Sequence, residues 1–453
     1  MTALYYALGV IVFVVAILVS IGLHEFGHLI PAKKFGGKVT QWFIGFGPTV
    51  WSRRVGETEY GVKGFPLGGY VKIVGMLPPG EGHSAIELDE QGEPVERIRG
   101  SSTGLFTQLI SDAREAEWEH IRPADSPRLF YKLPWWKKVI VMAGGPTVNI
   151  LIAFAIFAPL FATYGNPNDV RATTTVSYVA PCVVPVEETG RECTPEDPVT
   201  PAYDAGLRSG DVITSFNGTA IGEDDWKVLQ REIRANDAGD ATIGILRDGR
   251  ELTIETTTTV ALRPVATDAA DERDELVQVG FLGVSPDAYL GSGGLLYTLG
   301  EMGDMTVRTV EALAELPVKV WGVARAIVGL EERAADSPVS IVGGGRLAGE
   351  TVAHEGFDPV EKLAFLAMLV AGFNFFIGMF NFVPLLPLDG GHIAGALYEG
   401  LRRGVARLRG RPDPGHVDVA KLLPVAYVAG VAMLVMGLVL IVGDLVVPLH
   451  IAG

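Results

Sequence analysis

His24, Glu25 and His28 are the residues of this chain best suited to chemistry, because they form an H-E-x-x-H sequence. They follow Ala3–Leu23, a run of 21 residues without a charge. On a helix, positions i and i+4 lie on one face, so both imidazoles can bind one zinc ion with Glu25 beside it as general base. Ionisable groups at the end of an apolar span usually face a functional cavity rather than lipid. The spacing therefore predicts a zinc site within a membrane.

A catalytic zinc ion takes three protein ligands and keeps one position for water, so a third ligand must come from another segment. The strongest candidate is Asp389, which follows the uncharged run Leu363–Leu388. His392 is a rival ligand from the same segment. The residues that would interrupt a helix here and permit a tight turn toward the metal are Pro384, Pro387, Gly390 and Gly391.

The composition is that of a membrane protein. The chain has 453 residues, a net charge of −16 and a mean hydropathy of +0.30, which is high for a soluble protein. Four uncharged runs are long enough to cross the roughly 30 Å hydrocarbon core of a bilayer. They are Ala3–Leu23, Val139–Tyr164, Leu363–Leu388 and Leu422–Gly443. The first lacks the basic start of a signal peptide, so we expect it to be retained. The negative net charge disfavours a nucleic-acid partner.

Basic residues cluster beside the ends of these runs, and such clusters mark cytoplasmic segments. They are Lys33, Lys34, Lys38, Arg53 and Arg54, then Lys132, Lys137 and Lys138, then Arg402, Arg403, Arg407, Arg409 and Arg411. We therefore predict a multi-pass protein of the cell inner or plasma membrane, surrounded by the lipid bilayer. Both termini and the 165–360 region would be extracytoplasmic. The active site would lie near the cytoplasmic side, because His24 ends a span that runs inward.

The segment that follows the first span favours β-hairpins, because short apolar runs over 43–73 are punctuated by glycine. Such backbone near a membrane must be covered by protein or line a wet cavity. Gly45, Gly68 and Gly69 therefore belong to a candidate edge to which an extended substrate could add as a strand. The alternative is an interfacial loop that only packs against the protein. The polar insertion over 78–130 suggests no chemistry.

A β-rich module is expected over 172–262, outside the membrane. Its A-G-L-x-x-G-D-x-I sequence at 205–213 resembles that of a PDZ domain of the bacterial, circularly permuted type. Such domains bind extended peptides or C-termini along a sheet edge, here predicted between a strand over 173–180 and a helix near Ala202. The two cysteines, Cys182 and Cys193, lie in the loop between these elements. They could close a disulfide or remain free thiols.

An amphipathic helix is expected over 300–335, lying on the outer membrane surface or packed on the β-rich module. A glycine-rich break over 337–345 follows. The predicted fold class is a polytopic α-helical membrane protein with four transmembrane helices, a membrane-associated β-hairpin region and one extracytoplasmic PDZ domain. The predicted segments are 1–32, the first span; 33–134, the β region and insertion; 135–165, the second span; 172–262, the PDZ domain; 263–358, a linker with the amphipathic helix; 360–391, the third span; 392–419, a basic loop; and 420–448, the fourth span.

Several motifs together resemble the site-2 proteases, the intramembrane metalloproteases, and closely their bacterial regulator-of-sigma branch. They are H-E-F-G-H at 24–28, G-F-G-P at 45–48, P-L-G-G-Y-V-K at 66–72, G-G-P-x-x-N at 144–149, the PDZ sequence, and N-x-x-P-x-x-P-L-D-G-G at 381–391. The resemblance implies that His24, His28 and Asp389 bind one zinc ion and that Glu25 activates water. It also implies that Asn381 holds the substrate backbone near the scissile bond.

The resemblance also implies the substrates, which are single-span membrane proteins such as anti-sigma factors and remnant signal peptides. Some members of the branch have two PDZ domains in tandem, but this chain has one clear signature. Among the remaining candidates for substrate contact, Pro384 accompanies Asn381. Asn374 lies about two helical turns before Asn381, and a hydrogen bond between helices is its favoured role.

Two other functions use some of the same features. A membrane-anchored PDZ scaffold or chaperone would need no metal, and its activity would not depend on Glu25. A zinc transporter would use the same ligand types but would need neither Glu25 nor a peptide-binding module. The complete ligand set favours a zinc endopeptidase that cuts within spanning segments.

Overall fold

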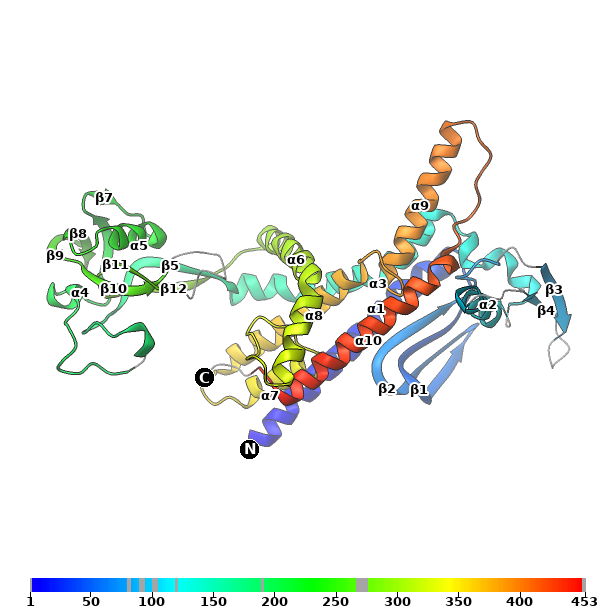
Figure 1. Cartoon of the computed structure of the whole chain (residues 1–453), viewed down its shortest axis with the longest axis horizontal. Helices are drawn as coiled ribbons and strands as arrows, with labels where there is room; N and C mark the ends of the chain where they lie inside the picture. Colours follow the sequence, from blue (N-terminus) through cyan, green and yellow to red (C-terminus); the bar gives the residue numbers. More distant parts are fainter. Residues whose placement is uncertain are drawn as a thin grey trace. The chain divides into compact units, whose positions relative to one another are not determined.

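The computed structural model describes residues 2–79, 83–88, 94–99, 105–118, 121–188, 191–265 and 276–449 (Figure 1). The chain divides into two compact units. The membrane unit comprises Met1–Leu160 and Gly294–Gly453, and the sheet unit comprises Phe161–Gly293.

The membrane unit contains the predicted spans. Four helices among the described residues are long and apolar enough to cross a bilayer, which confirms the four predicted in the sequence. They are α1 (Thr2–Lys34), α3 (Trp135–Thr163), α8 (Pro359–Asn381) and α10 (Leu423–Val446), the last extended by the 3-10 turn η5 (Val419–Leu422). The other helices of this unit are α2 (Leu105–Trp118), α6 (Leu295–Ile327), α7 (Ile341–Ala353) and α9 (Asp389–Leu408), with the 3-10 turns η1 (Pro123–Arg128) and η2 (Phe130–Lys132).

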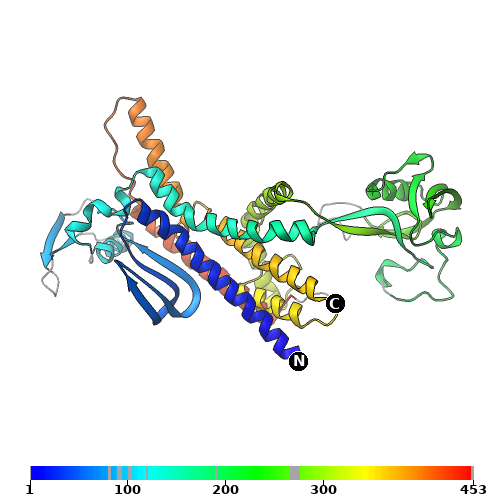
Figure 2. The same cartoon turned by 180° about the vertical axis from the view of Figure 1, so that it is seen from behind.

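A bent β-hairpin follows α1 and lies beside its C-terminal half, as Figures 1 and 2 both show. Its strands are β1 (Val39–Val55) and β2 (Thr58–Ile73). Both strands bend sharply. As a result, residues 41–44 of β1 pair with residues 59–62 of β2 and also with residues 69–72 of β2. Gly45 lies at the fold of β1 with φ +89°, a conformation that only glycine adopts readily. The hairpins predicted over 43–73 are therefore present.

A second, short hairpin falls in the polar insertion predicted over 78–130. It is formed by β3 (His83–Leu88) and β4 (Pro94–Arg99). The rest of that predicted insertion lies partly outside the described residues.

The structure has a helix where a break was predicted over 337–345. Helix α7 begins there because Ser340 caps it, accepting hydrogen bonds from the N–H groups of Val342 and Gly343. Three of its glycines lie on the face that packs on α1, and Gly343 faces Asp444 of α10 instead. Gly344 lies against Phe13, and Gly349 lies against Tyr6. Close packing against α1 therefore overrides the low helix propensity of glycine.

The third predicted span, 360–391, is also interrupted. Helix α8 ends at Asn381, an irregular segment follows over 382–388, and α9 begins at Asp389. Residues 392–408, predicted as part of a basic loop, are thus helical. The prediction failed because basic residues were taken as signs of a connection, although they are good helix formers.

Helix α6 covers most of the predicted amphipathic segment. It packs against α10, where Val320 and Val323 are buried and Val323 lies against Gly443. Its placement on the outer membrane surface stays a prediction.

The sheet unit extends beyond the predicted module of 172–262. Its strands are β5 (Asn166–Val179), β6 (Val212–Phe216), β7 (Thr219–Ala220), β8 (Asp240–Arg247), β9 (Arg250–Thr257), β10 (Thr259–Pro264), β11 (Leu276–Phe281) and β12 (Val284–Gly291). Its helices are η3 (Val186–Glu188), α4 (Pro201–Asp204) and α5 (Trp226–Ala235). A six-stranded sheet has the order β12-β5-β6-β8-β9 with β7 on β6, and β10 pairs with β11. Because β12 pairs with β5, the strands after residue 262 belong to this unit.

The A-G-L-x-x-G-D-x-I sequence has a structural explanation in this unit. Gly206 and Gly210 have positive φ, and Asp211 is buried. Burial raises the pKa of Asp211, but hydrogen bonds from Arg247 and from the N–H of Arg208 outweigh it and hold the pKa below its usual range. The motif therefore fixes a turn through a charged hydrogen-bond network.

We predict that Gly9→Ala destabilises the membrane unit by about 1–3 kcal/mol, because the added methyl group would overlap the backbone of α7 at Ala348. The measurement is thermal unfolding in detergent. The matched control is Gly437→Ala in α10, where a methyl group meets open space and alanine favours the helix. Equal unfolding temperatures for the two variants would contradict the close packing of α1 on α7.

Candidate active site

Helix α1 brings His24, Glu25 and His28 to the membrane unit's interior. Residues four apart lie one turn apart on a helix, so both imidazoles point to the same side. Both are buried, with exposed fractions of 9% and 3%. Gly27 faces α3, where its backbone contacts that of Gly144 so closely that neither position has room for a side chain. Small residues at this crossing therefore let α3 approach the two histidines.

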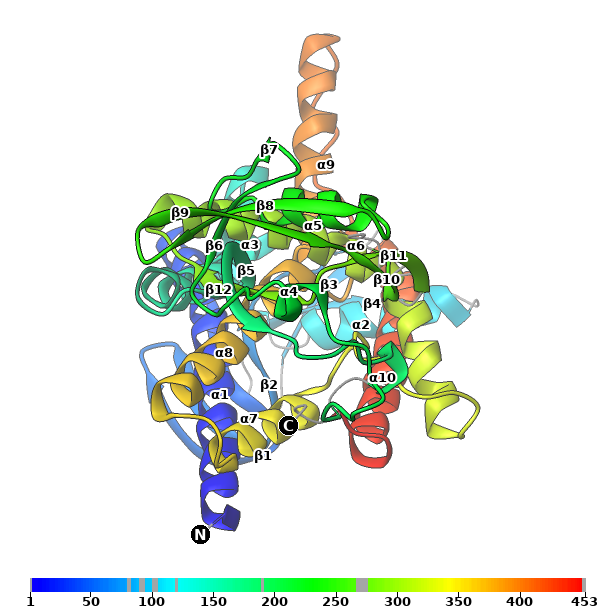
Figure 3. The same cartoon turned by 90° about the vertical axis from the view of Figure 1, so that its left-hand side faces the viewer.

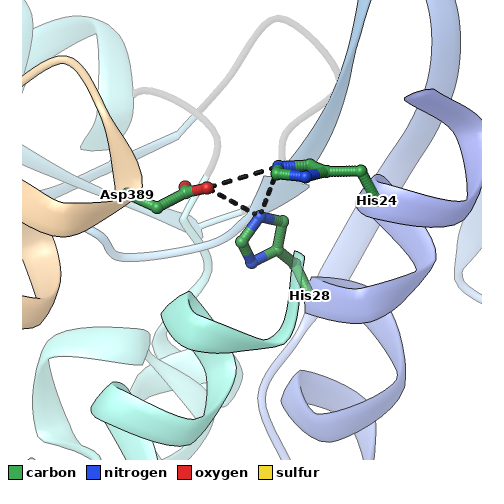
Figure 4. Close-up of side chains that lie close together, drawn as sticks. All are labelled: His24, His28 and Asp389. Carbon is green, nitrogen blue, oxygen red and sulfur yellow. Dashed lines mark hydrogen bonds and ion pairs between the residues drawn. The ribbon is translucent and has the colours of Figure 1, made fainter. Parts of the chain in front are cut away.

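Asp389 completes a triangle of polar atoms with the two histidines (Figure 4). Its Oδ2 lies 3.3 Å from Nε2 of His24 and 3.2 Å from Nε2 of His28, and the two Nε2 atoms are 3.2 Å apart. A tetrahedral ion with ligand bonds of about 2.0–2.1 Å requires neighbouring ligand atoms to be about 3.3 Å apart. The three atoms therefore match the spacing that zinc needs.

Helix α3 orients one of the two imidazoles. The Nδ1 of His28 lies 2.8 Å from the carbonyl oxygen of Val141. A carbonyl can only accept, so Nδ1 carries the proton and Nε2 presents its lone pair to the triangle. Gly145, one turn further along α3, lies against the Nε2 atoms of both histidines. A side chain at Gly145 would fill the space that an ion needs.

The electrostatics of the triangle also fit a cation. Among the described residues, no group donates a hydrogen bond to Oδ2 of Asp389. Nδ1 of His24 also has no hydrogen-bond partner among them. Buried polar atoms without partners cost free energy, and a cation held at the triangle would remove that cost for the carboxylate. His24, His28 and Asp389 are therefore a set of residues that could hold a metal ion.

Glu25 lies beside the triangle and beside the sheet. Its carboxylate lies close enough to all three residues of the triangle to interact with them electrostatically, and it lies near the backbone of Val71. The backbone of Gly69 lies close to its Cγ and leaves little room for a side chain. Glu25 is thus positioned between the triangle and the edge of β2.

The remaining predicted site residues divide into two groups. Gly69 lies beside Glu25. Asn381 ends α8, donates a hydrogen bond to the carbonyl oxygen of Ile377 one turn earlier, and remains partly exposed. Asn374 is fully buried and donates to the carbonyl oxygen of Val370 in its own helix, one turn earlier.

The other predicted residues lie outside the triangle. Gly45 and Gly68 serve the fold of the hairpin, where Gly68 lies against Phe46. Pro384 is exposed in the irregular segment between α8 and α9.

His392, the rival ligand, does not join the triangle. It lines a small cavity of about 20 Å³ with Lys138 and Glu399.

Sequence reasoning missed two contributions from α3, which are the carbonyl of Val141 and the contact of Gly145 with the imidazoles. The G-G-P-x-x-N motif was a signal for the glycine, since small residues mark close helix approach. A backbone carbonyl leaves no signal in the sequence.

The sheet unit contains a separate hollow of about 130 Å³ between α5 and β11. Apolar residues line most of it, together with Arg234 and Arg263. Burial lowers the pKa of the Arg263 guanidinium, which packs over the ring of Phe281. We predicted a peptide groove between the strand over 173–180 and the helix near Ala202. The hollow lies elsewhere, between α5 and β11. Most of the strand predicted over 173–180 belongs to β5, which pairs with β12 along one edge and with β6 at Thr175 on the other.

Comparison with known proteins identifies the family. The model of peptidase family M50 matches residues 12–412. The chain belongs to this family, the site-2 proteases. It is 34% identical to zinc metalloprotease Rip1 of Mycolicibacterium smegmatis over 98% of this chain and 99% of that protein. Identity to Rip1 of Mycobacterium tuberculosis is 33%, over 98% of each chain. Identity to zinc metalloprotease RasP of Oceanobacillus iheyensis is 26%, over 89% of this chain and 91% of that protein.

The chain is therefore a zinc metalloprotease and a multi-pass membrane protein, as the motifs predicted. Like other site-2 proteases, it acts on membrane-protein substrates within the bilayer.

We predict that Gly145→Ala lowers zinc affinity by about 10- to 100-fold, the usual effect of disturbing the surroundings of a metal ligand. The added methyl group would overlap Nε2 of both histidines. Zinc per chain, measured after dialysis against a weak chelator, checks this. The control is Gly372→Ala in α8, where the methyl group meets open space. Full zinc retention in Gly145→Ala would contradict the close contact between α3 and the two histidines.

Proposed function

We propose that this site-2 protease cuts the spanning segments of single-span membrane proteins, such as anti-sigma factors and remnant signal peptides, in regulated intramembrane proteolysis. His24, His28 and Asp389 hold one zinc ion, and Glu25 is the catalytic base. The single observation that carries these roles is the triangle of two imidazole nitrogens and a carboxylate oxygen, with edges of 3.2–3.3 Å and Glu25 beside it.

The residues divide the chemistry between them. Zinc, when bound, polarises the scissile carbonyl and acidifies a water molecule. Glu25 removes a proton from that water and then passes a proton to the leaving amine. Its position beside the triangle supports both transfers, since a proton acceptor must lie within hydrogen-bond reach. Asn381, at the partly exposed end of α8, holds the substrate backbone, with Pro384 in the adjoining segment.

The edge of β2 receives the substrate as an added strand. A helical spanning segment has all its backbone groups paired, so it must unwind locally before it can be cut. The N–H of Val71 faces Glu25. Alternate residues of a strand share orientation, so the backbone groups of Gly69 face the same side. Within the described residues β2 pairs only with β1, which leaves this edge open to a substrate strand.

The active site lies near the cytoplasmic side, and both termini and the sheet unit are extracytoplasmic. Basic residues support this orientation, since Lys33 and Lys34 form the last turn of α1 and Lys137 lies in the first turn of α3. Arg407, in the last turn of α9, belongs to the same side.

The sheet unit acts as a PDZ domain that binds an extended peptide or a C-terminus and restricts access by size. The hollow beside β11 supports this role, because β11 pairs on one side only, with β10, among the described residues. Arg263 lines this hollow, and its guanidinium offers an attraction to a carboxylate. Cys182 and Cys193 form a disulfide in this unit, which agrees with an oxidising compartment.

We predict that Glu25→Gln lowers the cleavage rate about 10²- to 10⁴-fold and leaves zinc binding intact, because the substitution removes the base and none of the three ligand atoms. The assay is cleavage of a truncated single-span anti-sigma-type substrate in detergent, with zinc per chain measured in parallel. Cleavage unchanged in Glu25→Gln would contradict the role of Glu25. Absence of zinc from both proteins when zinc is supplied would favour a non-catalytic scaffold.

We further predict that removing the sheet unit allows cleavage of a substrate that retains its outer domain. Asn166 and Gly291 are paired neighbours in β5 and β12, so a short linker can replace the residues between them. Cleavage of full-length and truncated substrate is compared for the intact and shortened enzymes. The truncated substrate is the control for folding, since both enzymes should cut it. If the shortened enzyme cuts only the truncated substrate, the sheet unit does not restrict access.

A further inference from the structure

A buried ion pair joins α3 to α9 away from the triangle. Nζ of Lys138 lies 2.7 Å from Oε2 of Glu399, and the two side chains are 7% and 1% exposed. Glu399 also accepts a hydrogen bond from the N–H of Val417 at 3.1 Å and lies 3.3 Å from Arg403. One carboxylate therefore connects α3, α9 and the segment that leads to α10.

The two helices that this pair joins both form the triangle's surroundings. Helix α9 begins at Asp389, and Glu399 lies ten residues later, about 15 Å along the helix axis. Helix α3 carries Val141 and Gly145, which contact the histidines. Because a helix is stiff over this length, a shift of Glu399 relative to Lys138 would change the direction in which α9 presents Asp389.

The other side-chain contacts of α9 are mostly with the segment that follows it, since Arg402 donates to the carbonyl oxygens of Pro414 and Gly415. Helix α9 makes no extensive backbone contact with another element among the described residues, and its C-terminal half projects beyond the other helices in Figure 3. Leu397, Tyr398 and Leu401 are exposed on it. Its side contacts include Gly400, which lies against the Trp135 ring. Ile393 of α9 also packs on the apolar cluster that includes Val141 and Met142, so the ion pair adds a buried polar contact to an apolar one between α9 and α3.

Stability alone does not account for such a pair. Removing two charges from water costs several kcal/mol per ion, and apolar replacements are often as stable or more stable. Buried charges are best attested where they fix the register of one element against another. We propose that Lys138 and Glu399 are positioning residues that set the location of Asp389 relative to His24 and His28. This inference rests on the proposed role of Asp389 as a metal ligand.

Cobalt replaces zinc in such sites and reports their geometry through its visible absorption spectrum. We expect Glu399→Gln and Lys138→Met, each in the full-length protein in detergent, to change the Co²⁺ spectrum and to lower Co²⁺ affinity about 10- to 100-fold. The matched control is Lys137→Met. Lys137 is the neighbour of Lys138 on α3 and packs over the rings of Phe35 and Trp136 instead of pairing with Glu399. It should leave the spectrum unchanged.

The double variant Lys138→Met/Glu399→Met separates positioning from stability. It leaves neither member of the pair as a lone buried charge, so the unfolding temperature of its metal-free form should return toward the wild-type value, while its Co²⁺ spectrum stays altered. Wild-type spectra for Glu399→Gln and for the double variant, with only the unfolding temperature lowered in the former, would overturn the positioning role. Asp389→Ala distinguishes the two proposals. If it binds Co²⁺ as the wild type does, the ligand assignment itself fails, whatever the pair does.

Discussion

Burying two imidazoles and a carboxylate with their lone pairs directed at one point costs free energy unless a cation lies at that point. In this chain the three ligand atoms lie within 3.3 Å of one another, and no other donor to the carboxylate oxygen is found in the part of the chain that the structure describes. The helices of the membrane unit bring these three atoms together. Helix α1 supplies two of them through helical spacing alone, and α9 supplies the third from a segment more than 350 residues later.

Glycine makes this convergence sterically feasible. Gly27 and Gly144 allow α1 and α3 to touch through their backbones, and Gly145 keeps the metal-facing side of the imidazoles free. Gly9 likewise lets the backbones of α1 and α7 approach closely, at Ala348. Within a bilayer there is no hydrophobic gain in bringing apolar helices together, so close packing of small residues carries much of the association. The site therefore depends on positions that have no chemistry of their own.

The sequence predicted the parts of this arrangement that follow from local rules. The i, i+4 spacing predicted that the two histidines lie on one face of a helix. Four uncharged runs predicted the four spans, and short apolar runs separated by glycine predicted the hairpin. Predictions failed where a distant contact decides the local structure. The glycines of α7 suggest a break when the packing of α1 on them is not considered. The arginines of α9 were a different failure, because their own helix propensity was overlooked. The extent of the sheet unit depends on the pairing of β12 with β5, which no local pattern indicates.

The central claim is that one zinc ion is bound by His24, His28 and Asp389. X-ray absorption spectroscopy of the zinc-loaded wild-type protein tests it most directly, because it reports the number and kind of atoms around the ion. Our account predicts two imidazole nitrogens at about 2.0–2.1 Å, with the remaining ligands oxygen at about 2.0–2.2 Å, and no sulfur. Asp389→Ala should lose one oxygen ligand or the metal itself. A third imidazole, which would implicate His392, or an unchanged spectrum in Asp389→Ala would contradict the assignment.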